Sequence, residues 1–173
     1  MQHLCAPWRS EYFSAKKDSC VFCEIINSKE DDEKNGVLFR AKHCFGIMNL
    51  YPYSPGHFMI IPNHHTDKIE ELDEQTWFEM SKFVRLGVEI LKRELHAQGV
   101  NIGMNLGKAA GAGIAEHVHY HLVPRWSGDT NFITTIADVR VNGTPFHPLY
   151  QKLKKAFSGV ICCLLYTSDA ADE

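Results

Sequence analysis

The sequence of 173 residues has no apolar run near the roughly 20 residues that cross a bilayer; the longest, GVICCLLY, is far shorter. Its first residues, MQHLCAPWRSEYF, lack the apolar stretch and small residues of a secretory signal peptide. It also lacks a block rich in lysine and arginine, and its formal net charge is −3, which argues against nucleic acid as the main partner. We therefore expect a cytoplasmic protein that binds neither membrane nor nucleic acid, with reduced thiols.

The composition is typical of a globular protein, with 45% hydrophobic and 23% charged residues. The length suits one domain with its own core. We expect an N-terminal arm at residues 1–19, a folded domain at 20–158 and a tail at 159–173. The end of that tail, CCLLYTSDAADE, has no helical or strand pattern and resembles a translated adapter, which leaves its native origin open.

The pattern of apolar residues predicts an α+β fold, in which helices cover one face of an antiparallel five-stranded sheet. Strands are expected in VLFRA, CFGIMNL, HFMIIP, VNIGMNLG and HVHYHLVP. A long helix is expected between them, with Asp73 as its N-cap and Gly99 as its left-handed exit. Its expected core stripe is Trp77, Met80, Val84, Val88, Leu91 and Leu95. A second, shorter helix is expected at HPLYQKLKKAF, residues 147–157.

The most unusual stretch is AEHVHYHLVPRW, which places His117, His119 and His121 at every second position. In a strand these three side chains share one face. They could be a plain polar face, but three histidines there by chance are improbable. They could hardly all bind one zinc ion, because the Cα atoms of the outer two would lie roughly 13 Å apart.

The interpretation that we favour for these histidines is chemical. A neutral imidazole is a nucleophile and a proton carrier near pH 7. Clustered imidazoles resist becoming charged together, which keeps at least one of them neutral. A central histidine could therefore attack phosphorus while a neighbour stabilises charge or handles the leaving group's proton.

The segment HVHYHLV also resembles the motif of the histidine triad (HIT) superfamily of nucleotidyl hydrolases and transferases. CVFCEII, NLYPYSPGHFMIIPNHH, NIGMNLGKAAGAGIAEH and PRWSGDTNF follow the family's order, so the resemblance covers about residues 20–132. It is strongest for the Fhit-like branch and the bacterial diadenosine tetraphosphate hydrolases and phosphorylases. It implies a HIT-like fold, a homodimer with joined sheets, and cleavage of a dinucleoside polyphosphate at its α-phosphate through a covalent histidine–nucleotide intermediate.

Carried over by position, the resemblance gives His119 the role of nucleophile, His121 that of phosphate donor and His57 that of support for the triad. It also implies nucleotide contacts from Asn49 at the ribose and from Asn105, Gly111 and Gly113 at the phosphates. Small residues let the chain approach an anion closely, which suits GKAAGAG. The plainer alternatives are a turn former at Asn49, an edge-strand amide at Asn105, a core histidine at His57 and a flexible loop.

One departure from the family pattern leaves open whether water or phosphate accepts the nucleotidyl group. Fhit-type hydrolases carry glutamine four residues before the first triad histidine, and the phosphorylases carry serine nearby; this chain has Gly113. We favour a hydrolase. The alternatives are a phosphorylase that transfers the nucleotidyl group to phosphate, an AMP phosphoramidate hydrolase, and a nucleotide-binding adaptor without turnover. Trp126 could be the wall of a base pocket or a core residue.

Of six cysteines, only Cys20 and Cys23 have the spacing of a metal-binding pair. They could also be two free thiols. The resemblance to bacterial HIT proteins implies a structural zinc site completed by His65 and His117, a closed set of two thiolates and two imidazoles. The spacing alone does not decide between His64 and His65.

Overall fold

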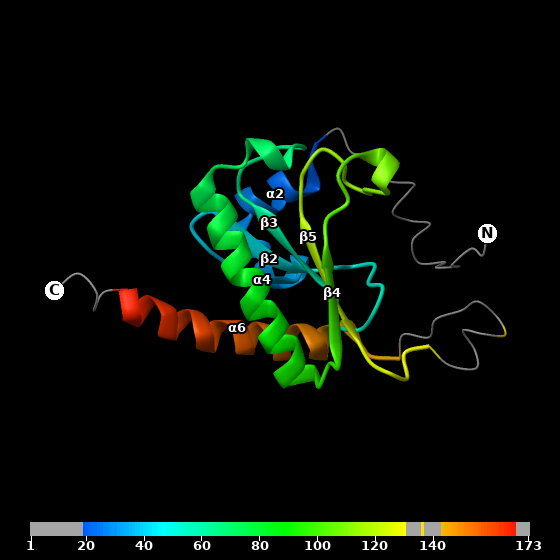
Figure 1. Cartoon of the computed structure of the whole chain (residues 1–173). Coiled ribbons are helices and arrows are strands. Elements are labelled where there is room, and N and C mark those ends of the chain that lie inside the picture. Colours follow the sequence, from blue (N-terminus) through cyan, green and yellow to red (C-terminus); the bar gives the residue numbers. More distant parts are fainter. Residues whose placement is uncertain (1–18, 131–135, 137–142, 169–173) are drawn as a thin grey trace.

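The computed structural model describes residues 19–130, 136 and 143–168, the last seven of these by their backbone alone (Figure 1). The expected N-terminal arm therefore lies almost wholly outside the described residues. The strands are β1 (Val37–Arg40), β2 (Cys44–Met48), β3 (Phe58–Pro62), β4 (Gly99–Gly103) and β5 (Tyr120–Arg125). The α-helices are α2 (Val21–Asn27), α3 (Asp32–Asn35), α4 (Glu74–Leu95) and α6 (Phe146–Ser168). Short 3-10 turns are η2 (Lys29–Asp31), η3 (Ile69–Glu71) and η4 (Lys108–Ala110).

The predicted five-stranded antiparallel sheet is confirmed, with strand order β1-β2-β3-β5-β4. Helices pack on both faces of this sheet, although they were expected on one face. One face packs against α4 and α6, through Met48, Phe58 and Leu122 among others. The opposite face packs against α2, and there Met59 lies beside both Ile47 and His121 in the strand register. The alternation along β5 therefore places His121 on the α2 face and Leu122 on the helix-covered face.

Helix α4 begins as predicted, because the Asp73 carboxylate accepts the Thr76 backbone N–H at 2.8 Å. The predicted exit was wrong. His96, with φ of 52°, takes the left-handed position, and Gly99 already belongs to β4. A non-glycine residue can adopt this conformation at modest cost, and here it aligns the chain with the edge of the sheet.

The predicted core stripe of α4 was only partly correct. Met80 and Leu91 are buried, whereas Trp77, Val84, Val88 and Leu95 are only partly buried. The helix turns a different side to the sheet because it also packs against α6. The residues that fill this side are Phe83, Gly87 and Ile90.

Helix α6 is longer than predicted. It has 23 residues, one more than the 22 of α4, so the expectation of a shorter C-terminal helix was wrong. Tyr150, Leu153 and Phe157 are fully buried in its first half. The helix then passes through residue 158 without a break, and residues 162–168 are helical although no helix was predicted there. Extension is cheap once a packed helix exists, because each further residue adds one backbone hydrogen bond.

Among the described residues, no helix has both the length and the apolar character that crossing a bilayer requires. The domain and tail boundaries at 19–20 and 158–159 remain predictions.

Candidate active site and metal cluster

Only one of the three alternate histidines lies in a strand. Strand β5 begins at Tyr120, so the prediction that the strand includes His117 and His119 was wrong. Before β5 the chain leaves the sheet ladder, and the Val118 N–H donates to the Thr66 carbonyl at 2.8 Å. This departure buries His117 and His119, at 0% and 6% exposure, against the α2 side of the molecule.

The tautomer of His119 is fixed by its neighbour. Its Nδ1 atom lies 2.8 Å from the His117 carbonyl oxygen, which can only accept a hydrogen bond. Nδ1 therefore carries the proton, and Nε2 keeps its lone pair. Burial also lowers the pKa of His119, so the ring stays neutral. A neutral imidazole with a free Nε2 lone pair is the form that a nucleophile needs.

His121 is held in the complementary form by a short relay. The Tyr53 backbone N–H donates to His57 Nδ1 at 3.2 Å, so the proton of the neutral His57 ring is on Nε2. That Nε2 lies 3.0 Å from His121 Nδ1. His121 Nδ1 must then accept, which leaves an N–H on His121 Nε2. The structure thus pairs an imidazole lone pair on His119 with an imidazole donor on His121, with ring centroids 4.8 Å apart.

The predicted nucleotide-binding residues converge on one pocket. Its lining includes Asn49, Asn105, Gly111, Gly113, His119 and His121, with His57 directly behind His121. The enclosed part is small, about 60 Å³, so a nucleotide at the triad would extend over the exposed rim. The structure brings these residues together, while their individual roles remain predictions.

Sequence reasoning missed four lining residues: Tyr51, Tyr53, Met59 and Ile114. Tyr53 stacks on His57, with ring centroids 5.0 Å apart and an interplanar angle of 19°. The Tyr51 backbone N–H donates to the Asn49 side-chain oxygen at 2.9 Å, which orients that amide. The available signal was the run NLYPYSPGH, which places two tyrosines between two predicted site residues.

The four predicted metal ligands form a cluster. The ligand atoms of Cys20, Cys23, His65 and His117 all lie within 4.8 Å of one another. Cys20 Sγ is 3.4 Å from His117 Nδ1, and Cys23 Sγ is 3.2 Å from His65 Nδ1. Tetrahedral zinc with bonds of about 2.1 and 2.3 Å separates its ligand atoms by roughly 3.6 Å, so the set fits zinc. The cluster contains His65 and not His64.

The protonation of the cluster also suits a cation. His117 Nε2 lies 3.0 Å from the Pro62 carbonyl and must donate to it, which leaves the lone pair on Nδ1, facing the thiols. Burial lowers the pKa of His117 to about 4, so the ring is neutral. Burial and the neighbouring Cys20 raise the pKa of Cys23, because two adjacent thiolates are unfavourable without a positive charge between them.

The metal cluster and the triad meet at α2 and His117. Phe22, which lies between the two cysteines in sequence, is 2% exposed. Its ring contacts His117 and His119 edge-on, with centroid distances of 5.5 and 5.3 Å. Helix α2 and its N-cap residue Cys20 therefore contribute both thiols and the side chain that packs against the candidate nucleophile.

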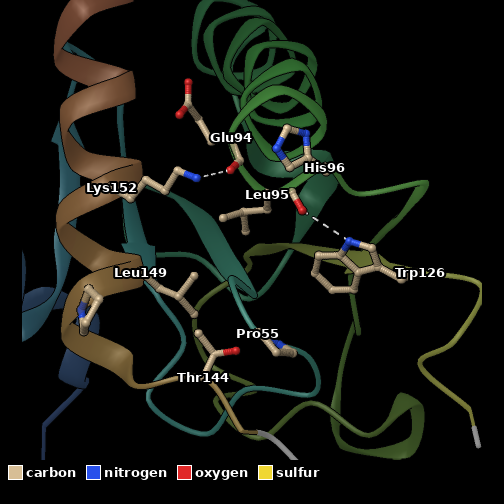
Figure 2. A pocket seen from close by; sticks show the side chains of 9 residues that line it. Pro55, Glu94, Leu95, His96, Trp126, Thr144, Leu149 and Lys152 are labelled. Carbon is tan, nitrogen blue, oxygen red and sulfur yellow. Dashed lines mark hydrogen bonds between the residues drawn. The ribbon is translucent and has the colours of Figure 1, made fainter.

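A larger pocket, of about 490 Å³, lies away from the triad between the end of α4 and the start of α6 (Figure 2). Its lining is mostly apolar, with Pro55, Leu95 and Leu149, and Lys152 donates to the Glu94 carbonyl at its rim. Trp126 lies here, with its indole N–H donating to the Leu95 carbonyl at 3.2 Å. Trp126 also packs against the core and is absent from the triad pocket, which favours the core interpretation of this residue.

Comparisons with known proteins agree with this fold and site. The HIT domain family model matches residues 30–128. The chain is 36% identical over 151 residues to a Mycobacterium tuberculosis protein named AP-4-A phosphorylase, covering 82% of this chain and 76% of that protein. It is 25% identical over 150 residues to an adenosine 5'-monophosphoramidase of Candida albicans, covering 84% and 96%. Its fold is similar to a zinc-bound histidine triad family protein of Mycobacterium smegmatis, with a TM-score of 0.68, 27% identity and coverage of 84% and 97%.

Imidazoles clustered at the start of β5, beside a glycine-rich loop, define a class of histidine-based nucleotide-processing proteins. This chain belongs to the HIT domain family, as its match to the family model and to the M. tuberculosis relative shows.

Proposed function

We propose that this protein is a nucleotidyl hydrolase or transferase that cleaves dinucleoside polyphosphates at the α-phosphate, with diadenosine tetraphosphate as its preferred substrate. The observation that carries the proposal is the pair of complementary tautomers that the hydrogen bonds indicate, with the lone pair on Nε2 of His119 and the proton on Nε2 of His121. The name of the M. tuberculosis relative supports the substrate class.

The reaction proceeds in two displacements. His119 Nε2 attacks the α-phosphorus, a P–N bond forms, and the bond from phosphorus to the bridging oxygen breaks. His121 donates a hydrogen bond from Nε2 to the phosphate oxygens and keeps its proton, and the polyphosphate leaves as an anion with the electron pair of the broken P–O bond. An acceptor then attacks the same phosphorus, the P–N bond breaks, and the electron pair returns to His119. When the acceptor is water, the proton that it loses passes to the solvent. Asn49, Asn105 and the Gly111–Gly113 backbone hold the nucleotide during both steps.

The acceptor is water in a hydrolase and inorganic phosphate in a phosphorylase. Gly113 has no side chain with which to select either of them. Sequence reasoning favoured water, and the name of the M. tuberculosis relative favours phosphate. A second candidate reaction, hydrolysis of AMP phosphoramidates, uses the same first step and is supported by the name of the C. albicans relative.

Product analysis distinguishes these reactions. Diadenosine tetraphosphate gives AMP and ATP when water is the acceptor, and ADP and ATP when phosphate is. ADP that appears only with added phosphate identifies a phosphorylase. His119→Ala should abolish turnover while nucleotide binding persists, and retained turnover in that variant would contradict the covalent mechanism. If the wild-type protein turns over neither diadenosine tetraphosphate nor adenosine 5'-phosphoramidate, the result favours the hypothesis of a nucleotide-binding adaptor without turnover.

Zinc is part of the proposal as a structural ion held by Cys20, Cys23, His65 and His117. When bound, it would join α2 to the segment that carries His65 and to the start of the triad. A zinc-bound neighbour of similar fold supports this assignment. Metal analysis of the purified protein tests it, with one zinc per chain as the expected result.

A homodimer with joined sheets is the proposed assembly. Strand β4 is at the edge of the sheet, and within the described residues it pairs with β5 alone. Its outer residues are exposed, including Ile102 at 48%. An open, partly apolar edge strand is suited to pairing with a second copy. Sedimentation equilibrium should give twice the chain mass, and Ile102→Lys should shift the protein toward monomer.

A further inference from the structure

We propose that Lys108 is a specificity-determining residue, which binds the phosphates beyond the scissile α-phosphate. This inference rests on the proposed function, because it concerns the leaving group of the same reaction. It predicts that the protein distinguishes a polyphosphate leaving group from an uncharged one through this side chain.

The first argument is charge. The residues that line the triad pocket include no lysine, arginine or carboxylate, and burial lowers the pKa of His119, which keeps that ring neutral. They come from residues 49–59 and 105–121, and in these two stretches Lys108 is the one lysine or arginine and Glu116 the one carboxylate. A polyphosphate carries several negative charges, which amides and neutral imidazoles bind without neutralising. Lys108 is the cation that these stretches offer.

Glu116 does not cancel this positive charge at the substrate. It is exposed and directly precedes His117, where its charge acts on Cys23 and His117 of the metal cluster. Its charge also favours protonation of His119, but burial is the larger effect and keeps that ring neutral. The glycine-rich side of the pocket, from Asn105 to Ala115, has no carboxylate in its sequence.

The second argument is position. Lys108 opens η4, a turn closed by hydrogen bonds from the Ala110 and Ala112 N–H groups to the Gly107 carbonyl, at 3.2 and 3.3 Å. The Gly111 N–H donates to the Lys108 carbonyl at 3.0 Å. This turn leads directly into Gly111, which lines the triad pocket. In Figure 1 it is the short yellow-green helix beyond the upper ends of β4 and β5.

The side chain of Lys108 is exposed, and its flexible four-carbon stem lets its ammonium group follow phosphates that leave the small enclosed pocket. A hydrated ammonium on a flexible stem suits a mobile phosphate chain better than a rigid bidentate group does. The plainer interpretation is that Lys108 is an ordinary surface lysine. The two interpretations differ in which substrates a substitution affects.

The test compares two substrates whose leaving groups differ in charge. We would measure kcat/KM for diadenosine tetraphosphate and for adenosine 5'-phosphoramidate, which has no further phosphate. The variants are Lys108→Gln, Lys108→Arg and, as a matched control on the exposed side of α4, Lys82→Gln. Lys108→Gln should lower the ratio of the two kcat/KM values about tenfold, mainly through KM for the tetraphosphate. Lys108→Arg should restore the ratio to within about twofold, and Lys82→Gln should keep the wild-type ratio.

Ionic strength gives an independent readout. The wild-type rate with diadenosine tetraphosphate should fall as salt rises, and the Lys108→Gln rate should fall less steeply. A Lys108→Gln protein with the wild-type substrate ratio and the wild-type salt dependence would overturn the inference.

A binding measurement separates this inference from the proposed function. Calorimetry with the His119→Ala protein compares the Kd of ATP with that of AMP, without turnover. Lys108→Gln in that background should weaken ATP about tenfold relative to AMP. An inactive wild type with this selective effect would contradict the proposed reaction and support Lys108 as a polyphosphate ligand. An active wild type without the selective effect would support the reaction and contradict the role of Lys108.

Discussion

Protonation of His117 should make the metal-free protein sensitive to acid. This ring is fully buried, at 0% exposure, and burial lowers its pKa from 6.5 to about 4. Between these two pH values the unfolded chain binds a proton at residue 117 and the folded chain does not. The contribution to stability is therefore fully present above pH 6.5 and is lost as the pH falls toward 4.

The size of this effect follows from the shift. One pKa unit corresponds to about 1.4 kcal/mol, so a shift from 6.5 to about 4 corresponds to about 3 kcal/mol in all. Since a small domain has a free energy of unfolding of roughly 5–15 kcal/mol, this loss is measurable. Bound zinc would oppose it, because a proton and the metal compete for the same Nδ1 atom.

Urea unfolding of chelator-treated protein at several pH values between 4 and 7.5 measures the slope. The control is His117→Gln, which cannot take up a proton at that position. Other titrating groups contribute equally to both proteins, so the difference between their slopes isolates residue 117. The wild-type free energy of unfolding should fall by up to about 1.4 kcal/mol per pH unit more than that of the variant. Equal slopes would refute the reasoning.

Three further predictions concern the site and the core. Because burial holds the pKa of His119 below 6.5, the acid limb of the kcat/KM profile should lie below pH 6.5, and a midpoint at or above 6.5 would contradict a neutral nucleophile. Cys23→Ser should lower the zinc content below one per chain, and it should reduce kcat more than it raises KM, because α2 then holds His119 less firmly. Metal analysis and steady-state kinetics measure these effects. An unchanged kcat would argue that the metal cluster and the triad are independent. Gly87→Ala should destabilise the fold by about 1–3 kcal/mol in calorimetry, because the added Cβ would lie 2.6 Å from Phe58 and 2.8 Å from Leu122. Helix propensity alone predicts a stabilisation of about 1 kcal/mol. A higher Tm would therefore contradict the packing argument.

Much of the fold could be predicted from the sequence because it depends on local patterns of residues. Five apolar segments became five strands, and Asp73 caps α4 as predicted. The errors arose where tertiary contacts decide. The stripe of α4 is shifted by its contact with α6, and His96 replaces Gly99 at the helix exit because the strand has to begin at Gly99. The length of α6 was missed because its final turns have no amphipathic pattern of their own.

The candidate site was predictable in its membership more than in its geometry. The motif identified His119 and His121, and the structure adds the reason that they differ chemically. That reason depends on the His117 carbonyl and the Tyr53 backbone N–H, which no side-chain pattern can reveal. The start of β5 at Tyr120 was missed for a similar cause, since the pairing of Val118 with Thr66 is a long-range backbone contact.

Residue 117 serves the two candidate sites with different parts of itself. Its imidazole faces the thiols, and its carbonyl accepts a hydrogen bond from His119, the proposed nucleophile. Every amino acid brings a carbonyl to that position, but few bring a metal ligand. A substitution of His117 during evolution could therefore remove the metal site and keep the hydrogen bond that orients His119, provided that the backbone stays in place. The same separation could be used in protein engineering. The metal ligands could be replaced by apolar side chains that pack α2 against the loop of residue 117, while the backbone carbonyl of that residue still orients His119.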